Sequence, residues 1–152
     1  MRRRTLIVAG GLALVVAAAV GAVLGTNARG GSSTVVAFQT VSAAQLAAAG
    51  VSLNAPTDGG SASAAAVSAQ AAATDALQNT ESQKVLETHF AHCVDTQMTP
   101  TLDRDCWAVS LDPSNVESSP APGFPAQHAT YLVALIDPSS GKFIEAIDGS
   151  QP

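Results

Sequence analysis

The chain holds a short stretch in which residues of metal-ligand type lie close together. His89 and His92 are separated by two residues, Cys93 follows directly, and Cys106 comes later. Histidine nitrogen and cysteine sulfur are the usual ligands of zinc and copper. However, Val85–Val94 alternates as a strand does, which places His89 and His92 on opposite faces, and likewise His92 and Cys93. A tetrahedral site would need a bend or bulge, so we expect no metal here but a disulfide flanked by histidines.

The only two cysteines of the chain are Cys93 and Cys106. An even pair in a small domain of an oxidising compartment indicates one disulfide. Cys93 lies near the end of one predicted strand and Cys106 opens the next. An antiparallel hairpin would bring their Cα atoms within the ~4.4–6.8 Å that a disulfide requires. We expect the bond to stabilise the domain by roughly 3 kcal/mol.

Nucleophilic catalysis would need a free thiolate at Cys93 or Cys106 beside a histidine, and a disulfide removes it. The nucleophile-elbow motif GxSxG is absent, although serines are abundant and His128 offers a further base. We therefore expect no enzyme, no catalytic residue and no cofactor. The alternative that stays open is a metal-binding or hydrolytic exported domain that uses His89, His92 and His128.

Four aspartates, Asp95, Asp103, Asp105 and Asp112, surround the cysteine pair. A calcium loop needs carboxylates at fixed short offsets with a glycine at the turn, and no such glycine is present. We interpret these aspartates as a solvated hairpin tip.

The large aromatic residues are few, at 4% of the chain. They could line an aromatic ligand groove, but so small a number is needed for the core, and we expect them there. The residues concerned are Phe90, Trp107, Tyr131 and Phe143, four of the six aromatic residues of the chain.

The N-terminal segment predicts the compartment. Arg2–Arg4 precede an uncharged, largely apolar stretch, Thr5–Gly25. At about 1.5 Å per residue, a helix of that length spans roughly 30 Å, the thickness of a bilayer's hydrocarbon core. The arginines place its N-terminus in the cytoplasm. We expect residues 1–28 to be a signal anchor that contacts the membrane through residues 5–25, or a signal peptide if it is cleaved. The rest is then extracytoplasmic, either membrane-anchored or secreted.

The charge of the exported part argues against nucleic acid. From Gly30 onward only Lys84, Arg104 and Lys142 are basic, against all twelve acidic residues, so the formal net charge is 3 − 12 = −9. A phosphate-backbone binder needs clustered lysine and arginine. We expect no nucleic-acid partner.

The exported chain is long enough for one domain. Residues 29–60 are interpreted as a spacer that contains a short strand, Thr34–Val41, and a short helix behind a capping box of Ser42 and Gln45. Residues 61–152 form the exported domain. Its alanine-rich segment Ser61–Gln78 predicts a helix. Helical spacing puts four of its residues on one face: Val67, Ala71, Thr74 and Leu77.

Alternating apolar residues then predict four strands. They are Val85–Val94, Cys106–Leu111, Thr130–Ile136 and Lys142–Ile147. The turn Asp137–Gly141 makes the last two an antiparallel hairpin, because Asp137 can bond the turn backbone and Gly141 supplies a positive φ. The expected fold class is α+β, with an N-terminal transmembrane helix and then a helix packed on a roughly four-stranded antiparallel sheet.

The closing segment, Tyr131-Leu-Val-Ala-Leu-Ile-Asp137-Pro-Ser-Ser-Gly141-Lys-Phe-Ile, resembles the last hairpin of PepSY-like domains. In that family a strand ends in an aspartate, a turn with a small residue and a glycine follows, and a second apolar strand begins. The resemblance extends over Ser61 to Gly149, because the family also places an alanine-rich helix before antiparallel strands. The chain departs from the pattern at Pro138, in its cysteine pair and in its proline-rich loop.

The resemblance implies a small extracytoplasmic α+β domain that binds or inhibits proteases or cell-envelope systems, with no catalytic residue to transfer. We therefore expect a non-enzymatic cell-envelope module with a protein or peptide partner.

Overall fold

The computed structural model describes residues 35–56, 60–118 and 127–150. Its fold is α+β, as predicted. The elements along the chain are α1 (Ala43–Ala48), β1 (Val51–Asn54), α2 (Ala69–Asn79), β2 (Val85–Asp95), β3 (Leu102–Leu111), β4 (Glu117–Ser118), β5 (Gln127–Ile136) and β6 (Phe143–Ser150).

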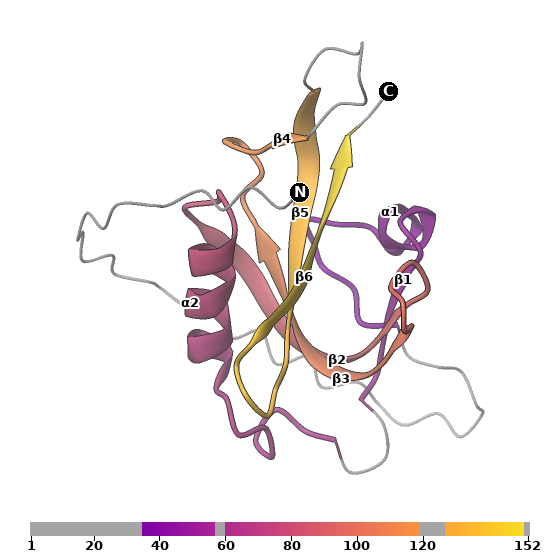
Figure 1. Ribbon diagram of the computed structural model, residues 1–152, viewed down its shortest axis with the longest axis vertical. Helices are drawn as coiled ribbons and strands as arrows, with labels where there is room; N and C mark the ends of the chain where they lie inside the picture. Colours follow the sequence, from indigo (N-terminus) through magenta and orange to yellow (C-terminus); the bar gives the residue numbers. More distant parts are fainter. Residues whose placement is uncertain (1–34, 57–59, 119–126, 151–152) are drawn as a thin grey trace.

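The strands form one curved antiparallel sheet (Figure 1). Its main order is β1-β2-β3-β5-β6, and β4 pairs with the first residues of β5. The four predicted strands are confirmed as β2, β3, β5 and β6. The sheet also contains β1 and β4, which were not predicted. They have four and two residues, too few for an alternating pattern to be recognised.

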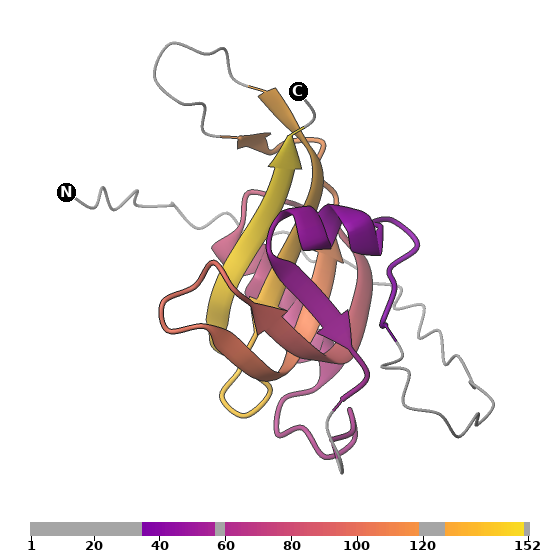
Figure 2. The same cartoon turned by 90° about the vertical axis from the view of Figure 1, so that its right-hand side faces the viewer.

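The two helices lie on opposite sides of the sheet (Figures 1 and 2). We call these sides the α1 face and the α2 face. On the α1 face, side chains from β2, β3 and β5 form a buried core with Phe38, Val41 and Leu46 from the chain before β1. That part of the 29–60 range thus contributes directly to the core. On the α2 face, Trp107 and Leu111 pack with their neighbours against the helix.

The segment before α1 does not form the strand expected over Thr34–Val41. Within the described part of that range, the pairing with β1 is one isolated bridge, Val35 to Asn54, beside which the Val36 amide donates to the Leu53 carbonyl at 3.0 Å. The amides of Gln39 and Thr40 donate instead to the Glu87 carboxylate, at 2.9 and 3.0 Å from Oε1. At these two amides a side-chain carboxylate takes the place of the strand partner that a β-strand would need.

Helix α1 has the predicted capping box. The Ser42 hydroxyl accepts from the Gln45 amide, and the Gln45 side chain accepts from the Ser42 amide at 2.9 Å. The chain then turns at Gly50, whose φ of +79° is costly for any residue with a Cβ. Local sequence was sufficient to predict this helix, because the residues that begin and end it lie next to it in the chain.

Helix α2 is shorter than the expected range Ser61–Gln78. It begins at Ala69, because the Ser68 hydroxyl accepts from the Ala71 amide and caps it. The preceding residue is held by tertiary contacts: the Val67 amide donates to the Pro138 carbonyl at 3.0 Å, and the Val67 carbonyl accepts from Trp107 Nε1 at 2.8 Å. These bonds outweigh the helix propensity of the alanines that come before.

The buried face of α2 also differs from the prediction. Ala72, Ala73 and Ala76 are buried, whereas Ala71 and Thr74 are exposed. Alanine occupies most positions around this helix, so the hydrophobic period barely distinguishes one face from another. Packing against the sheet therefore sets the rotation of the helix.

The hairpin of β5 and β6 closes as predicted. Asp137 Oδ1 accepts from the Ser139 and Ser140 amides at 2.8 and 3.0 Å, and Gly141 has a φ of +71°. The Ser139 hydroxyl also donates to Asp137. This bond, the backbone amides and Arg104 outweigh burial and lower the pKa of Asp137 to about 2.

Within the described residues, α1 with six residues and α2 with 11 are too short to span a bilayer, and no helix meets that requirement. The transmembrane helix expected over Thr5–Gly25 lies outside the described residues.

Candidate functional site: a groove beside the β2–β3 hairpin

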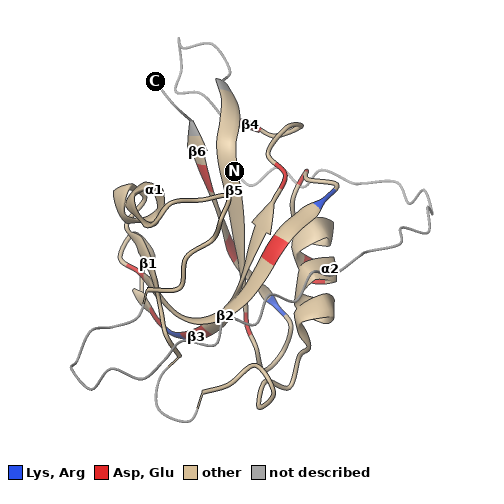
Figure 3. Cartoon of the chain, turned by 180° about the vertical axis from the view of Figure 1, so that it is seen from behind, with Lys and Arg blue, Asp and Glu red and all other residues tan. Residues whose placement is uncertain are grey.

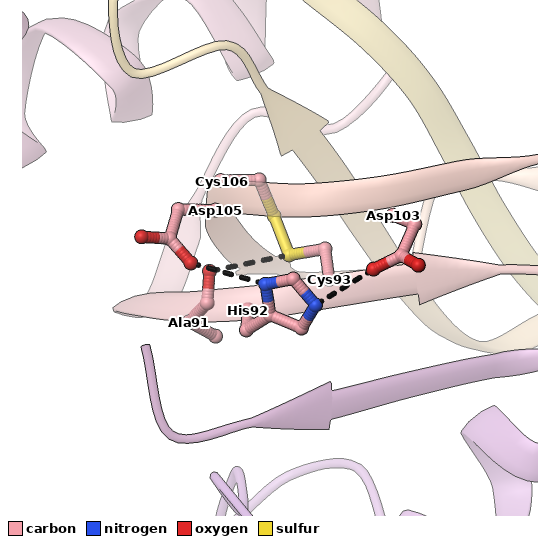
Figure 4. Close-up of a disulfide and its surroundings, with 6 residues drawn as sticks. All are labelled: Ala91, His92, Cys93, Asp103, Asp105 and Cys106. Carbon is pink, nitrogen blue, oxygen red and sulfur yellow. Dashed lines mark hydrogen bonds and ion pairs between the residues drawn. A yellow bond between two sulfur atoms is a disulfide. The ribbon is translucent and has the colours of Figure 1, made fainter. Parts of the chain in front are cut away.

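Strands β2 and β3 carry most of the residues that the sequence singled out. The structure joins Cys93 and Cys106 by a disulfide, with Cα atoms 5.9 Å apart, as predicted (Figure 4). Both cysteines are fully buried on the α1 face. The bond ties two adjacent strands inside the core, so neither sulfur is a thiolate available for nucleophilic catalysis.

His92 lies opposite Asp105 in the ladder and bridges two carboxylates of β3. Its Nε2 lies 2.8 Å from Asp103 Oδ1, and its Nδ1 lies 3.2 Å from Asp105 Oδ1 (Figure 4). The three side chains therefore form a polar cluster, which we call the His92 cluster.

The structure does not bring the three histidines of the open alternative together. His89 contacts Glu87 and packs edge-on against Phe38 on the α1 face, whereas His92 joins the β3 aspartates. His128 is exposed near the start of β5, and its backbone lies opposite Glu117 in the β4–β5 ladder. Among the described residues, no group of three potential ligands has a metal-binding arrangement.

The aspartates of the expected hairpin tip behave differently from one another. The Asp103 side chain is 69% exposed, as expected, but Asp103 lies within β3 opposite Val94 and not in the hairpin tip. Asp95, however, is buried, so the prediction was wrong at this position. Its Oδ1 accepts from the Gln97 and Met98 amides at 2.7 and 3.3 Å. Those hydrogen bonds offset part of the free-energy cost of removing the Asp95 carboxylate from water.

An open groove of about 290 Å³ lies next to the His92 cluster. We call it the Phe90 groove. Its walls are the segment 60–66, Phe90 of β2, Asp105 of β3, and Pro138 and Ser139 of the β5–β6 turn. The lining is mainly apolar, and among the described residues that form it Asp105 is the one ionisable residue. Asp105 therefore belongs to both the groove and the His92 cluster.

The walls of the Phe90 groove are held in place by contacts already described. The bonds of Val67 to Trp107 and to Pro138 fix the segment 60–67 to β3 and to the β5–β6 turn. Beneath, Phe90 packs edge-to-face on Trp107 with ring centroids 5.1 Å apart. A groove with rigid walls loses little conformational entropy when it is filled.

The electrostatic environment of the groove is acidic. Among the described residues the basic side chains are Lys84, Arg104 and Lys142, and acidic positions are distributed over the sheet (Figure 3). Arg104 is already paired with Asp137, at 3.0 Å. With Asp103 exposed and Asp105 in the wall, the field at this site favours a cationic ligand.

Sequence reasoning treated Phe90 as a core residue and placed the segment 61–67 in a helix, so it missed the groove. The small side chains of Ala64, Ala65 and Ala66 are what leave the space open. In the sequence, the same alanines indicate a helix. Only the tertiary bonds of Val67 show that this segment is not helical.

Comparisons with protein-family models, with curated proteins and with solved structures give no match to this chain.

Proposed function

We propose that the chain is a non-enzymatic extracytoplasmic binding module of PepSY-like type, and that the Phe90 groove holds a segment of a protein or peptide partner. The observation that carries the proposal is a preformed, largely apolar groove with a carboxylate in its wall. The export pattern of residues 1–28 and the disulfide both support an extracytoplasmic location. The domain is anchored through residues 5–25, or secreted if the segment is cleaved.

The size and chemistry of the groove favour a peptide side chain over a cofactor. Its volume of about 290 Å³ lies at the small end of the range for ligand sites, roughly 300–1,000 Å³. The alanines and Phe90 suit an aliphatic side chain. A carboxylate offers about four acceptor sites, so Asp105 can accept from a cation in addition to its partners within the domain. The expected occupant is a peptide that places an aliphatic residue next to lysine or arginine.

A displayed random-peptide library selected on the full chain in detergent tests this proposal. We expect enrichment of sequences that pair an aliphatic residue with lysine or arginine. The Ala66→Trp variant fills the groove and should weaken binding of a selected peptide by about tenfold or more, which corresponds to about 1.4 kcal/mol. Asp105→Asn should weaken it by a similar factor, because a desolvated charge pair loses one partner.

Two matched variants control for nonspecific effects. Ala71→Trp adds the same side chain at an exposed position of α2, and Asp148→Asn removes an exposed carboxylate from β6. Both should bind as the unmodified chain does. Equal loss in Ala66→Trp and Ala71→Trp would refute the groove as the binding site. Stoichiometric zinc or copper, lost in His92→Ala, would instead select the metal-binding or hydrolytic alternative through His89, His92 and His128.

A further inference from the structure

The His92 cluster lies directly beside the Phe90 groove, and Asp105 belongs to both. Phe90 and His92 are separated by one residue in β2, so their side chains lie on the same face of the sheet, the α2 face. Figure 4 shows one carboxylate oxygen of Asp105 directed at the His92 ring and the other directed away from it. A change of charge at His92 therefore acts on the carboxylate in the groove wall.

The two contacts of the His92 ring depend on its protonation. While Asp103 and Asp105 are both ionised, their carboxylates can only accept. The contacts at 2.8 and 3.2 Å are then both hydrogen bonds only if each ring nitrogen carries a proton. A neutral ring keeps one donor, so one of the two contacts is lost. One cation and two carboxylates sum to −1, and two carboxylates alone sum to −2, so loss of the ring proton makes the cluster more negative.

The described elements around His92 bring no other charge to the cluster. Strand β1, which lies opposite His92 at Asn54, contains no ionisable residue, and neither do the two loop segments that line the groove. Arg104 lies between the two aspartates in β3, but alternation directs its side chain to the other face, and it pairs with Asp137 at 3.0 Å. In the described part of the chain, the two aspartates are thus the ionisable groups that contact His92.

We propose that His92 regulates the Phe90 groove: its protonated form weakens the binding of a cationic peptide, and loss of the ring proton strengthens it. This inference rests on the proposed function, since it concerns the lysine or arginine of the peptide that contacts Asp105. The protonated ring competes with that side chain for the same carboxylate, and its charge repels the incoming cation. The side chains of His92 and Asp105 are 18% and 19% exposed, so solvent screens this repulsion less than it would at the surface.

The direction of the effect follows from linkage. The proton and the peptide each lower the affinity of the protein for the other, and thermodynamic reciprocity makes the two factors equal. A histidine ordinarily changes its charge between about pH 5 and pH 8. The affinity for the peptide should therefore rise as the pH is raised through this range. We expect a factor of about five, the lower end of the coupling usual between two sites.

Peptide affinity measured against pH tests this regulation without any mutation. The probe is an arginine-containing peptide selected on the full chain in detergent, with both termini blocked and with no histidine or acidic residue. Its dissociation constant should fall about fivefold between pH 5.5 and pH 8. The same peptide with citrulline in place of arginine carries no charge, so it should bind more weakly and without pH dependence. Equal affinity of the arginine peptide at both pH values, or the same pH dependence for the citrulline peptide, would overturn the proposal.

Two variants assign the pH dependence to one histidine. His92→Gln keeps an amide donor but cannot become charged, so its affinity should not change with pH and should be close to that of the unmodified chain at pH 8. His128→Gln, at an exposed position of β5, is the matched control and should keep the full pH dependence. A pH dependence that persists in His92→Gln would refute the regulation, even if Ala66→Trp still weakens binding and so supports the groove. If Ala66→Trp binds as the unmodified chain does, the proposed function itself fails, and the regulation fails with it.

Discussion

The two faces of the β2–β3 hairpin belong to the same strands but are covered to different extents. On the α1 face, the disulfide and apolar side chains are enclosed by residues 36–54. On the α2 face, the helix covers Trp107 and Leu111 but leaves Phe90 beside an open groove. The closed face explains stability, and the open face offers a place for a ligand. Substitutions on the two faces should therefore have different consequences.

The largest effect is expected on the closed face. The double variant Cys93→Ser/Cys106→Ser should lower the free energy of unfolding by roughly 2–4 kcal/mol, because the unfolded chain regains its loop entropy. Chemical denaturation under oxidising conditions measures the loss, and the unmodified chain with reductant should show the same change. Binding of a selected peptide should persist. Two freely reactive thiols in the oxidised protein would contradict the structural role of the disulfide.

The contact between α2 and the sheet should be the next most sensitive. Ala76 is fully buried against the sheet, so Ala76→Leu should cost about 1–3 kcal/mol through overpacking. Ala71→Leu, at an exposed position of the same helix, is the matched control and should change the stability little. Urea denaturation of both variants gives the comparison. Equal stabilities would mean that α2 does not pack as described.

The turn that borders the groove should show a pH-dependent effect. The pKa of Asp137 is lowered to about 2, so its contribution is present above about pH 4 and lost as the pH falls toward 2. Asp137→Asn should cost about 1–2 kcal/mol at pH 7, since the shift is close to two pKa units and the side chain is 14% exposed. Unfolding curves of the variant and the unmodified chain should converge near pH 2. A constant difference at all pH values would show that charge is not the cause.

The smallest effect is expected at Glu87 on the closed face. Burial raises its pKa, but hydrogen bonds from Gln39, His89 and Thr40 lower it by more, so the net pKa is lowered. Glu87→Gln should cost about 1 kcal/mol at pH 7. The difference should disappear as the pH falls below 4.5 through the lowered pKa. Thermal melts at pH 7 and pH 3 measure it, and an unchanged difference at pH 3 would contradict this assignment.

The elements that were predicted correctly are those with local or strongly periodic signals. The capping box of Ser42, the turn at Asp137 and the four long strands all carry their own patterns. The disulfide followed from the cysteine count and the predicted hairpin. These features depend on residues close in sequence, or on a pattern of period two that few other structures share.

The features that were missed depend on distant partners. Whether residues 61–67 continue the helix depends on Trp107 and Pro138, and the extended chain at Gln39 depends on Glu87. No local pattern contains this information, so the Phe90 groove became visible only in the folded chain.

The most direct test of the account is to map where a selected peptide binds. Amide NMR shifts of the full chain, followed during titration with the peptide, should change at Ala64–Ala66, Phe90, Asp105 and Ser139. The fluorescence of Trp107, the only tryptophan, should change with the same dissociation constant, because its ring packs on Phe90. Shifts confined to α1, β1 and the turn 96–101, with no change at Phe90 or Asp105, would contradict the proposed groove.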